Sequence, residues 1–322
     1  MQRIFVMSPV ARATSNDAVW ISDLLAHGLI RASFVPPTQI QEVRDLTRTR
    51  TQLGREVAQH IQRIQKTLEN ANIKLTSVIS NIMGPSGRRI LKAMIRGETN
   101  PAKLAELGST GLKCPRADLT AALDGRVTAH HRFLIAHHLR LIEELEKHIA
   151  AFDARIEELL APLGNAVAQL ITIPGVSRVS AQVILAELGA DMTAFPTSGH
   201  LLSWAGLTPR LDESAGKRRS TRVRKGAPWL KPVLVQCAWG AAHTKGTYYQ
   251  FFRIKARRGP KKAAIAVAAS LLTAAYHMLK NGTFHQDLGA DFLVQHDKAR
   301  IATKLANRIK DLGYDVCLTP VA

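Results

Sequence analysis

The stretch IAHHLRLIEELEKHIAAFDARIEELL, from Ile135 to Leu160, repeats its apolar side chains at alternating intervals of three and four residues. This alternation is a heptad seam, the pattern of a helix that packs along its length against another helix. The pattern predicts one long helix from about Leu119 to Leu160, and it favours a mainly α fold. The seam positions are Ile135, His138, Ile142, Leu145, Ile149, Phe152, Ile156 and Leu159.

A second long helical region precedes the seam, from Gln39 to about Ile82. One face of this region is polar, and the other carries an apolar series of Val43, Leu46, Leu53, Val57, Ile61, Ile64, Leu68 and Leu75. Two such helices can pack as an antiparallel hairpin within one chain, or they can form a coiled coil between chains. The spacing is compatible with both arrangements.

The texture of the sequence divides the chain into four parts. Residues 1–36 combine a short strand-like run with an amphipathic helix and end in two prolines, which force an extended path. Residues 37–162 form the long helical region, which glycines interrupt near its middle. Residues 163–295 alternate short apolar elements with glycines and prolines, and residues 296–322 form a tail.

The charge balance points to a polyanionic partner. The 322 residues carry a net charge of +19, with an isoelectric point near 10.4, and such an excess attracts nucleic acid above all. A membrane is the other candidate, but the most apolar run, Ala263 to Leu279, is short for a membrane span and contains a histidine. We interpret this run as a buried core helix. The N-terminus lacks a signal-peptide pattern and the three cysteines lie far apart, so we expect a cytoplasmic protein with no membrane partner.

A turn motif opens the C-terminal region. In LITIPGVSRVSAQVILAELGADMTAF, Leu170 to Phe195, a Pro174-Gly175 turn precedes an amphipathic helix. The pattern is similar to a helix-hairpin-helix, in which free backbone N–H groups at the turn and at the helix start hold a DNA phosphate. Gly175 is therefore a candidate nucleic-acid contact. The alternative is an ordinary αα-hairpin.

Two blocks of cations follow this motif. The first is a basic loop that contains Lys217, Arg218, Arg219, Arg222, Arg224 and Lys225, and the second contains Arg257, Arg258, Lys261 and Lys262. Each cation that neutralises a phosphate releases counterions, so binding through these blocks should weaken steeply with salt. Four aromatic residues, Tyr248, Tyr249, Phe251 and Phe252, precede the second block. They could stack on unpaired bases, but we favour a role in the core.

Ser214 lies inside the first block, in the segment ESAGK. A serine hydroxyl becomes a nucleophile only with help from a base, a metal or concentrated positive charge. Glu213 and the neighbouring cations could supply that help, and the cations could stabilise a pentavalent phosphate transition state. The alternative is an incidental serine in a polar loop. For a metal site the carboxylates near the N-terminus are Asp17 and Asp23, which do not make a complete set of ligands.

Taken in order, these segments resemble the Piv/MooV-type family of insertion-sequence transposases and DNA invertases, insertion-sequence family one-hundred-ten. The resemblance covers nearly the whole chain. Its markers are NDAVWISDLLAHGLIRASFVPP, RDLTRTRTQL, RIQKTLENANIKLTSVISNIMGPSGRRIL, IPGV, WAGLTP, ESAGKRRSTRVRKG and RRGPKKAAIAVAASLL.

The resemblance implies a RuvC-like α/β domain with four acidic residues that bind Mg²⁺, a helical coiled-coil middle, and a C-terminal transposase domain with a catalytic serine. Ser214 corresponds to that serine and Asp17 to the fourth acid, whereas Thr14 stands at the third and the first two would precede Met1. We therefore expect an N-terminally truncated member with only a remnant of the RuvC-like domain.

The resemblance also implies the function and the partners. Family members act as homo-oligomers, here a dimer or tetramer through the coiled coil, on DNA and with a structured non-coding RNA as guide. The implied reaction is DNA recombination through a phosphoserine intermediate. The alternative is a catalytically defective transposase that only binds nucleic acid or joins a full-length partner.

Overall fold

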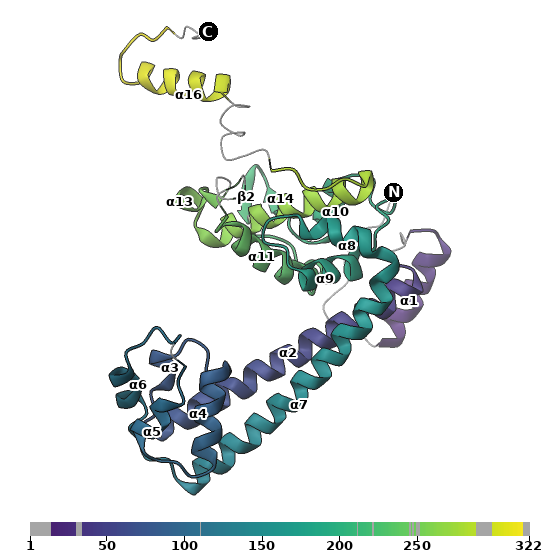
Figure 1. Ribbon diagram of the computed structural model, residues 1–322. Coiled ribbons are helices and arrows are strands. Elements are labelled where there is room, and N and C mark those ends of the chain that lie inside the picture. Colours follow the sequence, from purple (N-terminus) through teal and green to yellow (C-terminus); the bar gives the residue numbers. More distant parts are fainter. Residues whose placement is uncertain are drawn as a thin grey trace. The chain divides into compact units, whose positions relative to one another are not determined.

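The structure is a computed structural model that describes residues 14–29, 34–109, 111–210, 212–220, 222–244, 246, 248, 252–287 and 298–317. Helices dominate these residues, and one short two-stranded hairpin occurs among them (Figure 1). The mainly α prediction is confirmed. The chain divides into two units, Met1–Pro36 and Pro37–Ala322. In the first unit α1 (Thr14–Ala26) is the described element, and the strand expected before it lies outside the described residues.

Two long helices, α2 (Thr38–Asn70) and α7 (Ala129–Leu160), lie side by side in the second unit (Figure 1). They are antiparallel, because Arg50 pairs with Asp153 near one end and His60 contacts His138 farther along. Every predicted seam position of α7 is buried or half-buried, so the seam faces α2. Of the two arrangements that the spacing allowed, the structure has the hairpin within one chain.

The predicted helix from Leu119 to Leu160 is wrong in its first part. It is two helices, α6 (Arg116–Ala122) and α7, separated by a turn at Gly125. A Cβ at Gly125 would overlap the Ala71 carbonyl, and the Arg126 amide donates to the same carbonyl at 2.7 Å. Because the backbone passes so close to the end of α2 here, it turns instead of continuing as a helix. Thr128 then caps α7 through a hydrogen bond to the His131 amide. The helix predicted from Gln39 likewise ends early, at Asn70.

A small helical layer closes the far end of the α2–α7 hairpin. It consists of α3 (Leu75–Val78), α4 (Pro85–Ile95), α5 (Pro101–Glu106) and α6. Its core is aliphatic and draws on both long helices, with Ile64, Leu68, Leu75, Ile90, Leu91, Met94, Leu104, Leu123, Ile135 and Ile142. Burial of this apolar surface stabilises the tip of the hairpin.

The other end of the hairpin carries the C-terminal helices. In chain order the elements are η1 (Ala161–Leu163), α8 (Gly164–Ile171), α9 (Arg178–Leu188), α10 (Ser198–Trp204), β1 (Asp212–Ser214), β2 (Lys217–Ser220), α11 (Leu230–Ala241), α13 (Lys255–Arg258), α14 (Pro260–Asn281) and α16 (Lys298–Lys310).

Helix α14 is the centre of this group, and it packs against α8, α10 and α11. Its buried face includes Ala263, Val267, Leu271, Leu272 and Tyr276, and the Tyr276 hydroxyl donates to the Phe195 carbonyl at 2.9 Å. Within the described part of the chain it is the one helix long and apolar enough to cross a membrane. Its contacts confirm the prediction of a core helix.

Candidate nucleic-acid interface

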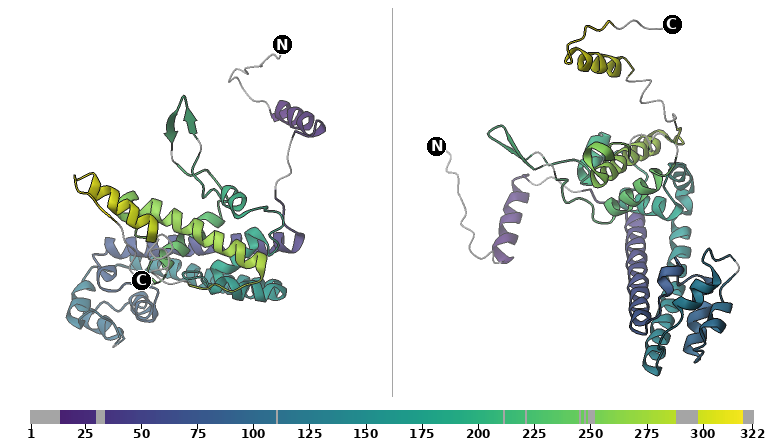
Figure 2. Two further views of the ribbon diagram at one scale, coloured as in Figure 1. Left: turned by 90° about the horizontal axis from the view of Figure 1, so that it is seen from above. Right: turned by 90° about the vertical axis from the view of Figure 1, so that its left-hand side faces the viewer.

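The predicted basic loop contains a β-hairpin, formed by β1 and β2, that extends away from the helices (Figure 2). Ala215 and Gly216 have φ values of 51° and 71°, the two positive values of a type I′ turn. The sequence did not reveal this hairpin because such turns favour asparagine or glycine at the first position, where this chain has alanine. The strands are only three and four residues long, too short for a clear alternating pattern.

Ser214 is the last residue of β1, immediately before the turn, and it pairs with Lys217 in the register. The pairing brings the lysine backbone opposite the candidate nucleophile at the tip of the hairpin. The side chains of Ser214, Arg218 and Arg219 lie outside the described part of the structure. Four other predicted contacts are described, and all four are exposed: Lys217, Arg222, Arg224 and Lys225.

The root of the hairpin is held rigidly. Pro209 bridges to Val223, and the Arg210 amide donates to the Arg222 carbonyl at 2.9 Å. A Cβ at Gly226 would overlap the Ala205 carbonyl, so only glycine permits this close approach of backbones. The tip of the hairpin is thus presented from a well-packed base.

A second cation cluster lies where α13 meets α14. Arg257 and Arg258 end α13, Gly259 turns the chain with φ of 82°, and Lys261 and Lys262 begin α14, with all four cations exposed. The first turn of α14 has no acidic residue, although the positive end of a helix dipole favours one. Two lysines at that end favour an anionic ligand.

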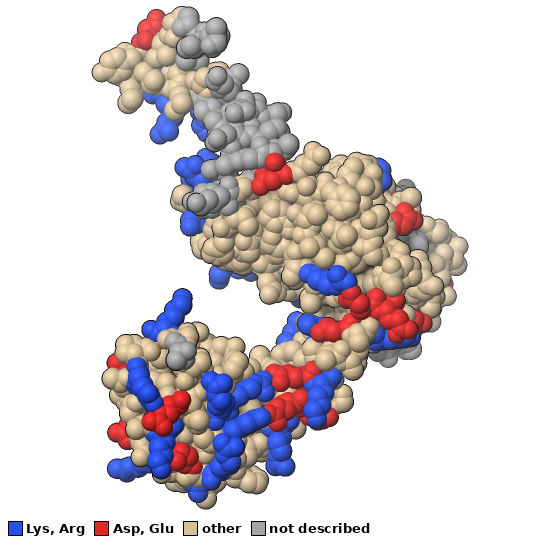
Figure 3. Space-filling model, in the orientation of Figure 1, with Lys and Arg blue, Asp and Glu red and all other residues tan. Residues whose placement is uncertain are grey.

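Acidic partners are scarce throughout this region. Between residues 206 and 262 the sequence has fifteen lysines and arginines but two acidic residues, Asp212 and Glu213. On α4 and α7, by contrast, Arg88 and Lys92 pair with glutamates, and cationic and acidic side chains interleave on that surface (Figure 3). The cations of the hairpin and of the α13–α14 corner therefore retain most of their charge for a partner.

The turn between α8 and α9 joins two helices, an arrangement that a helix-hairpin-helix and an ordinary αα-hairpin share. Ser177 caps α9, since its hydroxyl accepts a hydrogen bond from the Ser180 amide. Gly175 has φ of 82°, and its Cα faces α11 so closely that a Cβ would overlap the Cys237 carbonyl and the Ala241 amide. Packing against α11 accounts for this glycine. Its contact with a phosphate stays a prediction.

The aromatic residues near the second cation block divide into two groups. Tyr248 and Phe252 are buried, so the preferred core interpretation is confirmed for them, while Tyr249 and Phe251 lie outside the described residues. The Tyr248 hydroxyl lies 3.3 Å from His285 Nε2. Burial, with the nearby Asp287 charge, raises the pKa of Tyr248 to about 12, so this hydroxyl stays protonated.

Asp17, the candidate metal ligand, lies in the first turn of α1 and is exposed. The positive end of the helix dipole stabilises a carboxylate at this position, which gives Asp17 a structural role without any metal. Within the described ranges no three His, Cys, Asp or Glu side chains come close enough to hold a metal ion. The described residues therefore do not by themselves fit a Mg²⁺ site.

Comparison with known proteins gives two family matches. Residues 15–73 match a family of DEDD transposases of IS110 type, described as "Transposase", and residues 167–253 match the "Transposase IS116/IS110/IS902 family". The first match covers nearly all of α1 and all of α2, and the second runs from α8 through the β-hairpin and α11 to just before α13.

Two curated proteins are similar. The chain is 31% identical over 142 residues to "Insertion element IS110 uncharacterized 43.6 kDa protein" of Streptomyces coelicolor, which covers 42% of this chain and 34% of that protein. It is 30% identical over 135 residues to "Transposase for insertion sequence element IS1328" of Yersinia enterocolitica, with 40% of each covered. The matched part spans between a third and two fifths of these relatives.

Proposed function

We propose that this chain is a transposase of the IS110 family, which binds DNA through its basic hairpin and its α13–α14 corner and cuts and rejoins strands through Ser214. One observation carries the proposal. Ser214 ends β1 at the tip of a hairpin whose exposed cations include Lys217 in its own register pair. A nucleophile at such a tip would reach a phosphate that the surrounding cations attract.

The proposed step exchanges one phosphoester bond for another. The Ser214 oxygen attacks the phosphorus, a new Oγ–P bond forms, and the bond from phosphorus to one deoxyribose oxygen breaks. The serine proton ends on that leaving oxygen, which becomes a free hydroxyl. Because the number of phosphoester bonds is unchanged, attack by a new hydroxyl on the phosphoserine rejoins DNA without ATP.

The same surfaces support the two partners that the family resemblance implies. A structured RNA presents the same phosphate charge as DNA, and the α8–α9 turn, as a helix-hairpin-helix, adds backbone donors for either. For a homo-oligomer we propose the outer face of α7, since its seam is already packed on α2. Phe133, which is 67% exposed, is an apolar residue of α7 outside the seam.

A binding-only protein is the second candidate function. It is favoured by the scarcity of metal ligands in the described residues, where Asp17 stands without two partners. In that case the chain only holds nucleic acid or joins an active family member, and Ser214 attacks no phosphate.

The test is covalent capture of DNA. Labelled DNA with the ends of the insertion element is incubated with the chain and Mg²⁺, with and without an active family member, and adducts are resolved on a denaturing gel. Ser214→Ala should remove every adduct to this chain and leave DNA affinity within about twofold. Ser220→Ala, in the other strand of the same hairpin, is the matched control and should retain the adduct.

Three outcomes separate the candidates. An adduct formed by the chain alone supports the recombinase. Bound DNA without an adduct under either condition supports the binding-only protein. An adduct that persists in Ser214→Ala removes this serine from the mechanism.

A further inference from the structure

Trp229 connects the root of the basic hairpin to helix α2. It lies three residues after Gly226, just before α11, and two arginines of α2 stack on its indole ring. The guanidinium carbon of Arg55 is 5.2 Å from the ring centroid, and that of Arg48 is 5.7 Å away. Both distances are within the range of a cation–π interaction.

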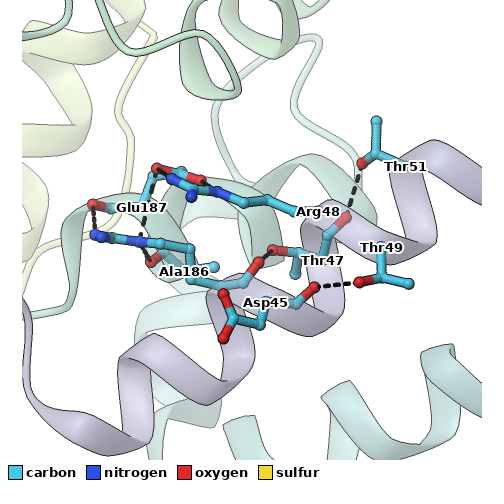
Figure 4. Close-up of polar contacts among 8 residues, drawn as sticks. Asp45, Thr47, Arg48, Thr49, Thr51, Ala186 and Glu187 are labelled. Carbon is cyan, nitrogen blue, oxygen red and sulfur yellow. Dashed lines mark hydrogen bonds and ion pairs between the residues drawn. The ribbon is translucent and has the colours of Figure 1, made fainter.

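Arg48 is itself fixed by a buried carboxylate. Its Nε and Nη2 donate to the two oxygens of Glu187 at 2.8 and 3.0 Å, and the Glu187 side chain is only 3% exposed (Figure 4). Arg44, one turn earlier, donates to the Ala186 and Glu187 carbonyls at the end of α9. A guanidinium can bind a carboxylate with its edge and an indole with its face at once, which an ammonium cannot do.

The segment from Gly226 to Trp229 has little freedom. Pro228 restricts its backbone, and the Lys231 amide donates to the Ala227 carbonyl. The Lys231 ammonium donates to the Arg224 carbonyl at 3.0 Å, and burial lowers the pKa of this lysine. A displacement of Trp229 would therefore be transmitted to the hairpin root.

We infer that Trp229 is a positioning residue. The stack of Arg48, Trp229 and Arg55 sets the direction of the basic hairpin relative to α2. The inference rests on the proposed function in taking the hairpin as the element that meets nucleic acid. The charge pattern of the sequence does not reveal this contact. It joins α2, which lies in the first family match, to Trp229, which lies in the second. The stack thus couples the two family segments.

Arg55 gives the sharpest test, because it is exposed and has no acidic partner among the described residues. Arg55→Gln removes one of the two arginines at the indole ring and leaves the Arg48–Glu187 pair intact. An exposed cation–π contact is worth about 0.5–1 kcal/mol, so tryptic cleavage at Lys217, Arg218 and Arg219 should become about two- to fivefold faster. Lys66→Gln, exposed on the same helix, is the matched control and should not change the rate.

Trp229 itself is tested by a pair of variants. Trp229→Leu should accelerate cleavage of the hairpin by more than fivefold, and Trp229→Phe, which keeps an aromatic face, should stay within about twofold of the parent chain. The cleavage products are identified by mass spectrometry, and thermal melting monitors the global fold. If Trp229→Leu does not fold, Arg55→Gln decides.

Parent-like cleavage of the hairpin in Arg55→Gln and in folded Trp229→Leu would overturn the inference. Because this measurement needs no DNA, it holds even if Ser214 proves not to be a nucleophile. In the DNA reaction, Trp229→Leu should lower adduct yield more than it lowers DNA affinity. Loss of the adduct in Ser214→Ala with parent-like yield in folded Trp229→Leu would retain the proposed function and reject the positioning role.

Discussion

Single glycines allow backbone segments of the C-terminal region to pack closely together, and Gly175, which lies against α11, is the clearest case. Its φ of 82° and its contact with the α11 backbone each exclude a side chain. A sequence motif alone would assign this glycine to phosphate binding. The structure adds a packing role that is independent of any ligand.

Gly175→Ala should destabilise the protein strongly. The left-handed backbone costs alanine about 1–2 kcal/mol, and the overlap with Cys237 and Ala241 adds about 1–3 kcal/mol. Urea unfolding should thus show a loss of roughly 2–5 kcal/mol. Gly164→Ala is the control, because Gly164 has helical dihedrals and open space around its Cα, and it should be neutral or slightly stabilising. Equal stability of the two variants would contradict the packing described for the turn.

At the scale of elements, the α2–α7 hairpin contains a pair of histidines between its helices. His60 Nδ1 and His138 Nδ1 are 3.1 Å apart, so one ring must be neutral to accept the hydrogen bond. Burial lowers the pKa of both histidines, and the charges of Arg63 and His137 act in the same direction, whereas Glu56 opposes them at His60.

This histidine pair should make the α2–α7 hairpin less stable at acidic pH. The pKa values of both histidines in the folded protein lie below the ordinary 6.5, so the unfolded chain binds protons first as the pH falls. The contribution of the neutral pair to the free energy of unfolding is therefore complete above about pH 6.5 and declines below it. The urea midpoint of the parent chain should therefore fall between pH 7.5 and 5.5 by more than that of His138→Leu. His148→Gln, at an exposed histidine of α7, should keep the parent dependence.

At the scale of the molecule, the distribution of charge separates two kinds of surface. Among the described residues, seven cations of α2, α4 and α7 pair with acidic side chains, whereas the described cations of the β-hairpin and the α13–α14 corner form no such pair. Only the second kind should release counterions when nucleic acid binds.

Replacement of Arg218, Arg219 and Arg222 by alanine should flatten the salt dependence of DNA affinity. Each lost phosphate contact lowers the slope of log K against log salt by about 0.9, so the triple variant should lose roughly 2 to 3. The control removes three exposed cations that already have acidic partners, Lys74, Lys147 and Arg155. An unchanged slope in the first variant would mean that these arginines face solvent in the complex.

Much of the fold was predictable, because periodicity and polarity are local properties of the chain. The three- and four-residue spacing in Ile135 to Leu160 predicted a helix with a buried seam, and the apolar run from Ala263 predicted a core helix. The cation blocks pointed to nucleic acid without any tertiary information. Helix ends were less predictable, since the break at Gly125 depends on a contact with Ala71.

The sequence by itself determined the helical class and the buried faces, and it predicted an anionic partner. Only the tertiary structure decided that α2 and α7 pair within one chain, that Ser214 stands at a hairpin tip, and that Arg48 links Glu187 to Trp229. The physical reason is separation along the chain: Arg48 and Glu187 are 139 residues apart. Such a contact depends on how all the intervening helices pack, which no local pattern encodes.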